Sequence, residues 1–401
     1  MEEFKLKKKV LFIMYNLELG GAEKSLISIL NNMDYTRYEV DLFLYEHSGE
    51  LIEQLPKEVT LLPEIKKYAT LCNSTKETFK DGYIRLGTVR TISKYHANLR
   101  KLPLAYDQYL YRYGSKLMEK LSKEYDTAIS NIWPHNLVVE KVNARRKIGW
   151  IHTDYSQMKV DYDMDFKILN KLDFIVAVSN QCKEVMDKIY PQLKSKIVII
   201  ENIVSKDVIT KLAEEPLKEI NEFKSRDIKL LTVARLHPEK GVDRAVEAAK
   251  KLKDEGKCFK WYIIGYGAQE KELLKRSKEL GIEKEVRFLG KKINPYPYFK
   301  SCDIYVQPSR YEGKAITITE AKFFNKPIVI TDYNSAKDQI DHGKNGLIVE
   351  NSTQGVYEGI KELMENTTIM EKFEENLKKD GISITNEIEK IYNLMQNNNK
   401  I

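Results

Sequence analysis

The stretch that decides the fold is residues 309–332, SRYEGKAITITEAKFFNKPIVITD. An apolar run, IYVQPS (304–309), leads into it, and a second apolar run, IVIT (328–331), follows a proline. Both runs predict buried strands. The residues between them predict a sharp turn at Gly313 and a helix over about 314–325. This order of strand, turn and helix puts the open N–H groups of a helix start at a strand end, where they can bind an anion.

Two glutamates in this stretch, Glu312 and Glu320, lie eight positions apart. Glu312 would lie at the mouth of the turn and Glu320 about two turns into the helix. Carboxylates at these places can accept hydrogen bonds from sugar or ribose hydroxyls. The spacing alone equally fits two surface glutamates of one helix, so the rest of the chain has to separate the two interpretations.

Strands and helices alternate along the whole chain, which predicts parallel, doubly wound α/β sheets. The first series of strands is predicted at residues 8–15, 38–46, 127–131, 147–153, 174–179 and 196–202, with helices beginning near residues 22 and 180. A charged stretch (212–227) indicates a linker between the two series of strands. The second series is predicted at residues 229–235, 259–265, 285–290, 303–308, 326–331 and 346–350, with helices over 241–254, 268–280, 314–325 and about 370–396.

Two loops predict contacts with phosphate. In LTVARLHPEKG, Arg235 ends a strand and Lys240 precedes a helix, so a guanidinium and an ammonium could both grip a diphosphate. In NLELGGAEKS, Gly20 and Gly21 allow backbone amides to approach a phosphate or sugar. The second loop lacks the glycine that a Walker loop has before Lys-Ser, which argues against ATP binding there.

Other motifs carry weaker signals. Gly265 and Gly267 form G-x-G without a third glycine, so the dinucleotide fingerprint is incomplete. His152 stands at a strand end beside Asp154, and Asn202 ends another strand; a turn or cap role is the simpler interpretation of Asn202 and Ser179. Three aspartates alternate in VDYDMDF (160–166), where Phe166 stands in place of the EF-hand glycine. We expect an exposed linker there, and the sequence indicates no metal site.

Composition sets further limits. The 401 residues suffice for two or three domains, and no apolar run is long enough to span a bilayer. Four scattered cysteines and the absence of a signal-like start predict a cytoplasmic protein.

Residues 66–123 carry thirteen Lys and Arg against four acids, with eight aromatics interleaved. Such a segment suits an anionic membrane surface, nucleic acid or a solvated helix face. No nucleic-acid module accompanies it, so no nucleic-acid partner is expected.

Taken in order, the GGAE loop, Arg235–Lys240, the G-x-G turn and the E-x7-E element with Gly313 and an alanine after Glu320 resemble retaining GT-B glycosyltransferases of family 4. The resemblance covers most of the chain and implies two Rossmann-like doubly wound domains facing a cleft. It places an acceptor-binding domain at 1–205 and a nucleotide-sugar-binding domain at 206–383. A C-terminal helix, about 384–401, would cross back to the first domain.

The resemblance also implies roles for single residues. A metal-independent, retaining hexosyltransferase would use a UDP- or GDP-sugar, no cofactor, and a front-face mechanism in which the leaving phosphate helps to take the acceptor proton. The residues implied as catalytic are Arg235, Lys240, Glu312 and His152. Those implied to bind the donor are Gly20, Gly21, Gly265, Gly267, Gly313, Lys314, Ala315, Ile316 and Glu320, with backbone groups of 291–294 near the base. Asp154 and Asn202 are the acceptor-side candidates.

The sequence around Glu312 is most similar to bacterial enzymes of surface-polysaccharide assembly, whose acceptors are often lipid-linked saccharides on the inner face of the plasma membrane. Lys314 departs from the family pattern, which leaves the donor sugar open. Three alternatives remain: a nucleotide-sugar epimerase of the same fold, a non-catalytic nucleotide-sugar-binding subunit, and an NAD dehydrogenase, for which the incomplete fingerprint is the obstacle.

Overall fold

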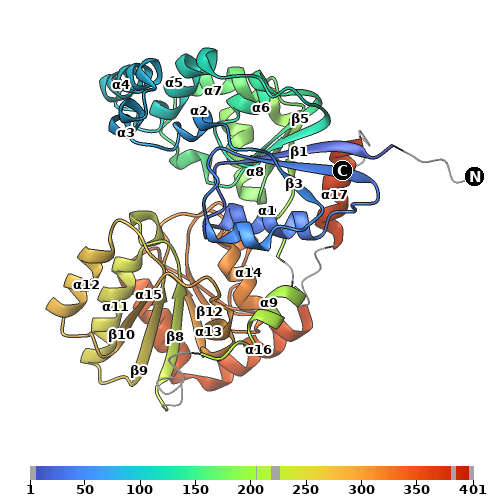
Figure 1. Ribbon diagram of the computed structural model, residues 1–401. Coiled ribbons are helices and arrows are strands. Elements are labelled where there is room, and N and C mark those ends of the chain that lie inside the picture. Colours follow the sequence, from blue (N-terminus) through green and yellow to red (C-terminus); the bar gives the residue numbers. More distant parts are fainter. Residues whose placement is uncertain (1–5, 205, 218–225, 381–384, 397–401) are drawn as a thin grey trace, which may run out of the picture. The chain divides into compact units, whose positions relative to one another are not determined.

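The chain divides into two compact α/β units (Figure 1). The N-terminal domain comprises Met1–Ile203 with Thr385–Ile401, and the C-terminal domain comprises Val204–Ile384. Each contains one parallel sheet, which confirms the fold class expected from the strand alternation. The structure, a computed structural model, describes residues 6–204, 206–217, 226–380 and 385–396. Within these ranges no helix is long and apolar enough to cross a membrane.

The N-terminal sheet has seven strands in the order β3-β2-β1-β4-β5-β6-β7. The order reverses between β1 and β4, where the chain leaves one half of the sheet and begins the other. The short β3 was not predicted from the sequence. The strands are β1 (Lys8–Met14), β2 (Tyr38–Leu44), β3 (Val59–Leu61), β4 (Glu124–Ser130), β5 (Asn143–Ile151), β6 (Phe174–Ala177) and β7 (Ile197–Ile199).

Helices cover this sheet, and four of them form an insert between β3 and β4. The insert consists of α2 (Lys66–Ala69), α3 (Thr75–Lys80), α4 (Ile84–Leu99) and α5 (Ala105–Gly114), followed along the chain by α6 (Asn136–Lys141), α7 (Tyr162–Leu169) and α8 (Asn180–Ile189). α1 (Gly21–Asn31) connects β1 to β2. The last helix, α17 (Thr385–Gln396), also belongs to this domain, as the fold class predicts. Its Tyr392 stacks on Tyr38 with ring centroids 5.3 Å apart.

The C-terminal sheet has six strands in the order β10-β9-β8-β11-β12-β13, so its order reverses between β8 and β11. The strands are β8 (Ile228–Val233), β9 (Phe259–Ile264), β10 (Val286–Gly290), β11 (Ile304–Gln307), β12 (Ile328–Thr331) and β13 (Leu347–Val349). The helices are α9 (Lys206–Leu212), α11 (Val242–Asp254), α12 (Glu270–Glu279), α13 (Tyr296–Ser301), α14 (Ile316–Phe323), α15 (Thr353–Glu365) and α16 (Thr367–Asp380).

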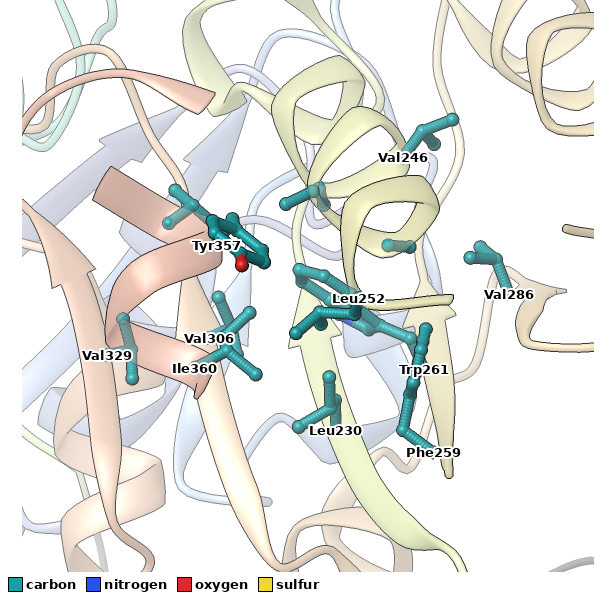
Figure 2. Close-up of a cluster of buried hydrophobic side chains, with 14 of the residues drawn as sticks. Leu230, Val246, Leu252, Phe259, Trp261, Val286, Val306, Val329, Tyr357 and Ile360 are labelled. Atoms are coloured by element: carbon teal, nitrogen blue, oxygen red, sulfur yellow. The ribbon is translucent and has the colours of Figure 1, made fainter. Parts of the chain in front are cut away.

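Two apolar clusters hold the strands of this domain in register. On one face, α11 and α15 cover the sheet around Trp261, whose indole N–H donates to Thr232 Oγ1 at 3.0 Å (Figure 2). Leu230 packs in this cluster, whereas its neighbour Leu231 packs in the cluster on the opposite face, as expected for successive residues of a strand. Because the strands are buried on both faces, their carboxyl ends are fixed, and the loops that follow begin from rigid positions.

Two expectations from the sequence were wrong in part. The segment with three alternating aspartates is not an exposed linker: Asp161 caps α7, and Asp165 is 4% exposed. Asp165 accepts hydrogen bonds from Tyr190 OH at 3.0 Å and Trp133 Nε1 at 2.9 Å, which offset the cost of burying the carboxyl. The expected linker, 212–227, also starts too early, because Ala213 is buried in the C-terminal domain; residues 218–225 lie outside the described residues.

Candidate donor site and a second polar cluster

The C-terminal domain gathers the predicted donor residues at the point where its strand order reverses. The loop after β8 carries Arg235 and Lys240, and the loop after β11 carries Glu312 and Gly313. Because β8 and β11 are adjacent parallel strands, these two loops leave the same edge of the sheet side by side. In open α/β sheets this is where ligands bind.

Lys240 and Glu312 join the two loops through an ion pair. The Lys240 Nζ lies 2.8 Å from Oε1 and 2.7 Å from Oε2 of the Glu312 carboxylate. The two side chains are only 18% and 9% exposed, so water screens the pair weakly. The sequence predicted both residues at the site, but it did not predict that they contact each other.

Polar side chains at the end of β11 and just after it donate hydrogen bonds to the Glu312 carboxylate. Ser309 Oγ donates to its Oε1 at 2.8 Å, and Gln307 Nε2 donates to the same oxygen at 3.1 Å. The Oε1 atom of the Gln307 side chain in turn accepts from Thr317 Oγ1 at 3.0 Å. A carboxylate fixed by several donors needs little reorganisation when a ligand arrives, which is the property expected of a preorganised site.

Glycines allow the loops of this site to touch backbone to backbone. Gly241 has φ +63°, and a Cβ there would lie 2.0 Å from the carbonyl oxygen of Pro308. A Cβ on Gly265 would lie 1.8 Å from the carbonyl oxygen of Ala234. These contacts leave no room for a side chain. The G-x-G turn therefore has a structural role in packing the β9 loop against the β8 loop, whatever else it contacts.

An arginine that the sequence analysis did not single out clamps the same loops. The Arg310 guanidinium makes a two-pronged contact with Asp243, at 2.8 and 2.6 Å, and also donates to the Pro238 carbonyl oxygen. Its backbone N–H donates to the Glu239 carbonyl oxygen at 2.8 Å. The loop with Glu312 is thus tied to the loop with Lys240 at a second point.

The start of α14 is also held from outside the helix. Gln339 accepts a hydrogen bond from the backbone N–H of Ala315 at 3.0 Å and donates to its carbonyl oxygen at 2.8 Å. α14 begins at Ile316, and its first N–H groups have no partner within the helix, so this end of the helix is electropositive. Ala315 and Ile316 are each 6% exposed, and Lys314 is partly exposed.

Arg235 and Glu320 have opposite environments. Arg235 is exposed, and its guanidinium makes no hydrogen bond or ion pair with other residues that the structure describes. Glu320 is 0% exposed and accepts a hydrogen bond from Tyr296 OH at 3.0 Å. Burial, and then the neighbouring carboxylate, raise the pKa of Tyr296 well above its usual value, so Tyr296 remains a donor. In this arrangement a ribose hydroxyl has no access to Glu320.

The remaining predicted residues lie in the N-terminal domain, on the loops that follow β1, β5 and β7. Gly20 is the N-cap residue of α1, and Gly21 begins the helix after β1. The Glu23 carboxylate lies over Gly20, where a Cβ would meet Glu23 Oε2 at 2.1 Å. Glu23 is therefore a first-turn acid that complements the helix N-terminus.

A polar cluster that the sequence revealed only in part surrounds His152. Burial lowers the pKa of His152 to about 4, against the opposing contacts of the Asn202 side chain and the Asn131 backbone. His135, which follows β4, is 1% exposed and contacts Ser130 Oγ at 2.9 Å through Nδ1. Burial, and secondarily His152, lower the pKa of His135 to about 3. Both rings are therefore neutral at physiological pH and can act as hydrogen-bonding groups only.

Asp154 and Ser179 act as local caps. The Asp154 carboxylate is 1% exposed and accepts from the backbone N–H of Ser156 at 2.9 Å and its hydroxyl at 2.7 Å. Ser179 Oγ accepts from the Cys182 N–H at the start of α8, which confirms the cap interpretation. Over the ranges that the structure covers, no group of three or more His, Cys, Asp or Glu side chains is arranged to hold a metal ion.

Sequence reasoning missed Gln307, Ser309, Arg310, Asn131 and His135. Gln307 and Ser309 could have been found, because polar residues two positions apart at the end of a buried strand point the same way. The contact of Arg310 with Asp243 and the proximity of His135 to His152 could not have been found from the sequence. The first pair is 67 residues apart along the chain and the second pair 17.

Comparison with known proteins agrees with this geometry. Residues 213–380 match the family model "Glycosyl transferases group 1". Among curated proteins, the chain is 28% identical over 163 residues to the N-acetylgalactosamine-N,N'-diacetylbacillosaminyl-diphospho-undecaprenol 4-alpha-N-acetylgalactosaminyltransferase of Campylobacter jejuni, covering 40% of this chain and 44% of that protein. It is 29% identical over 151 residues to the amylovoran biosynthesis glycosyltransferase AmsK of Erwinia amylovora, covering 35% and 37%.

Across the first four curated relatives, the matched region spans 37% to 63% of their own lengths.

Among solved structures, Anabaena Alr3699/HepE in complex with UDP-glucose has a TM-score of 0.70 at 16% identity, covering 97% of this chain and 100% of that one. The fold is thus the GT-B fold of such glycosyltransferases, which confirms the fold class.

Proposed function

We propose that the protein is a retaining, metal-independent hexosyltransferase. It would move a sugar from a nucleoside-diphosphate sugar to a saccharide or lipid-linked saccharide in cell-surface polysaccharide or glycolipid synthesis. The observation that carries this proposal is the Lys240–Glu312 ion pair at the strand-order reversal, with Arg235 exposed on the same loop. The group 1 match over 213–380 supports it.

The charges at this site suit a departing diphosphate. Lys240 and Glu312 together are close to neutral, so Arg235, exposed and without an acidic partner among the described residues, supplies the further positive charge. We infer that the Arg235 guanidinium meets the diphosphate first and that Lys240 and the turn at 313–316 share the remaining negative charge. Glu312 would then accept hydrogen bonds from donor-sugar hydroxyls. The predicted ribose contact of Glu320 requires the carboxylate to become exposed when the donor binds.

Transfer with retention needs no covalent nucleophile from the chain. In the front-face mechanism that we propose, the bond between the anomeric carbon and the diphosphate oxygen breaks, and the acceptor oxygen bonds to the same face. The acceptor proton passes to the leaving diphosphate oxygen. His152, neutral because burial lowers its pKa to about 4, would orient a sugar hydroxyl rather than supply charge.

The names of relatives and the free cysteines support proposals for the acceptor and the cellular location. Relatives named for undecaprenol-linked and amylovoran saccharides favour a lipid-linked or polymeric saccharide acceptor. Asn202 and Asp154 remain the acceptor-side candidates in the N-terminal domain. We propose that the protein works in the cytoplasm, on the inner face of the plasma membrane. All four cysteines are free thiols, which suits this reducing compartment. UDP is the first nucleotide to test, because UDP-glucose is bound in the HepE structure.

The test combines binding and turnover. Thermal unfolding with UDP, GDP and their sugars should show a rise in Tm for one nucleotide, which Arg235→Ala should abolish. With that donor and a pool of lipid-linked acceptors, nucleotide release should survive EDTA, and the product's anomeric configuration, read by NMR, should match the donor's. An epimerised sugar from donor alone would instead show an epimerase, and binding without turnover on any acceptor would show a non-catalytic subunit.

A further inference from the structure

Exposed apolar side chains are concentrated on the helical insert of the N-terminal domain. Of the ten large apolar side chains that the structure shows as exposed, six lie within residues 66–123. They are Phe79, Ile84, Ile92, Tyr95, Leu99 and Leu104. Single exposed apolar residues need no explanation, but a group of them on one segment marks an interaction surface.

Four of these residues form one stripe along α4. At 100° per residue, Ile84, Ile92, Tyr95 and Leu99 fall within about 80° of each other around the helix axis. Their exposed fractions are 67%, 44%, 64% and 69%. We call these four residues the α4 stripe. It occupies the side of α4 opposite Arg90 and Ala97, which are buried.

The buried side of α4 is anchored to the rest of the domain, so the orientation of the exposed stripe is fixed. The Arg90 guanidinium, 6% exposed, donates to the backbone carbonyl of Thr70 at 2.9 Å and to that of Leu71 at 3.3 Å. Ala97 packs in an apolar cluster with residues of α5. α3 and α4 form one end of the N-terminal domain, beyond the sheet (Figure 1).

The charge around the stripe identifies the kind of partner. Residues 66–123 carry thirteen Lys and Arg against four Asp and Glu, whereas the rest of the chain carries 53 against 55. The whole positive excess of the protein therefore lies in this segment. Arg85 and Lys94 are exposed on α4 itself, and Lys101 is exposed just after it. Apolar side chains rimmed by cations match the acyl boundary and anionic headgroups of a lipid surface.

We propose that the α4 stripe and its basic rim dock the protein on an anionic lipid bilayer. Tyr95 would lie at the headgroup level, and Ile84, Ile92 and Leu99 would enter the acyl boundary. The biological purpose of this docking rests on the proposed function, because a lipid-linked acceptor lies in such a surface. The docking itself does not require donor or acceptor, so it can be tested separately.

The test is flotation of the full-length protein with vesicles of phosphatidylcholine alone or with about one third phosphatidylglycerol. We expect binding only to the anionic vesicles, weakened at high salt. The double variant Lys94→Glu/Leu99→Ser should reduce this binding at least about tenfold, because it removes one apolar contact and reverses one charge. Its matched control is Leu274→Ser/Lys275→Glu on α12, where Leu274 is 47% exposed and the Lys275 side chain 79% exposed.

The control changes the same residue types and the same net charge, so it should bind like wild type. Equal loss in both variants, unchanged binding of the first, or no wild-type binding to anionic vesicles would each overturn the proposal. A wild-type dimer that Lys94→Glu/Leu99→Ser converts to a monomer, without vesicle binding, would show that the stripe instead joins two copies. Failure of the proposed function would appear separately, as absent nucleotide binding and turnover with vesicle binding intact.

Discussion

At the scale of single residues, two cations on one loop have different surroundings in the free protein. Lys240 is held against Glu312, whereas the Arg235 side chain is exposed and contacts no acid in the part of the chain that the structure describes. Removing Lys240 leaves a buried carboxylate with fewer donors, which costs stability. Removing Arg235 should leave the free energy of unfolding unchanged, because its interactions would form only with the ligand.

Arg235→Ala and Lys240→Ala should therefore separate stability from activity. Each should lower turnover by roughly 10²–10³, as expected for the loss of one group that stabilises a developing anion. Only Lys240→Ala should also reduce the free energy of unfolding, by about 1–3 kcal/mol. Urea unfolding and nucleotide release measure the two effects, with Lys275→Ala as the surface control. A near-normal rate in either variant would remove that residue from the mechanism.

The buried histidines predict a pH dependence of stability. In the unfolded chain both rings titrate near pH 6.5, whereas burial lowers the pKa of His152 to about 4 and of His135 to about 3. Between pH 6.5 and these values the unfolded state binds more protons, so stability falls as the pH falls. Each ring contributes up to about 1.4 kcal/mol per pH unit in this window.

His135→Asn, which keeps a polar atom near Ser130, should flatten this decline between pH 6.5 and 4.5. Asp107 acts in the opposite direction, because burial raises its pKa to about 6. The informative quantity is therefore the difference in unfolding free energy between variant and wild type, measured by urea titration at each pH. A difference that stays constant with pH would mean that His135 binds protons equally in the folded and unfolded states, so that burial does not lower its pKa.

At the scale of elements, the proposed donor site depends on how three loops pack. The loops after β8, β9 and β11 meet through backbone atoms at Gly241 and Gly265, and Arg310 ties two of them together. Turns that touch so closely behave as one unit. A change in one loop should therefore move the charged groups of another, even when no charged residue is altered.

Gly241→Ala tests this coupling against a control with the same backbone angle. Gly281 has φ +64°, close to the +63° of Gly241, but a Cβ there would meet nothing within 4 Å. Gly281→Ala should cost about 1–2 kcal/mol of stability from φ alone. Gly241→Ala should cost about 2–5 kcal/mol, because it also pushes against Pro308, and should weaken nucleotide binding. Equal stability and nucleotide affinity in both variants would argue against the coupling.

At the scale of the whole molecule, the end of the chain completes the domain formed by its beginning. Tyr392 OH accepts a hydrogen bond from the Asp34 N–H at 2.7 Å, and Gln396 Nε2 donates to Tyr38 OH at 2.9 Å. Ile391 is 0% exposed. α17 is thus part of the N-terminal core, although the whole C-terminal domain separates it from that core in sequence.

Tyr392→Ala should lower the stability of the N-terminal domain by about 3 kcal/mol through lost packing and an unpaired N–H. Tyr392→Phe, which keeps the ring stacked on Tyr38, should cost only about 1 kcal/mol. Hydrogen exchange should show weaker protection in α1 and β2 of the alanine variant, with β8 and β11 unchanged. Weaker protection confined to the C-terminal domain would contradict the assignment of α17.

Much of the candidate site could be predicted, because its residues fall at strand ends. Arg235, Lys240 and Glu312 each follow an apolar run, and parallel strands place such positions along one edge of a sheet. The three alternating aspartates of residues 160–166 gave a wrong prediction of an exposed linker, because burial depends on partners from other segments. Aspartates read as solvent-exposed in sequence, and only the tyrosine and tryptophan donors brought in from elsewhere make a buried Asp165 tolerable.

The linear order of amino acids therefore determined the element types, the parallel sheets and the chemistry available at each strand end, because periodicity and glycine placement act over a few neighbouring positions. Only the tertiary structure decided the partners: Lys240 with Glu312, Arg310 with Asp243, Tyr392 with Asp34, and the exposed stripe of α4. Such pairings join positions from 67 to 358 residues apart. They arise when sheets and helices pack, which local patterns do not encode.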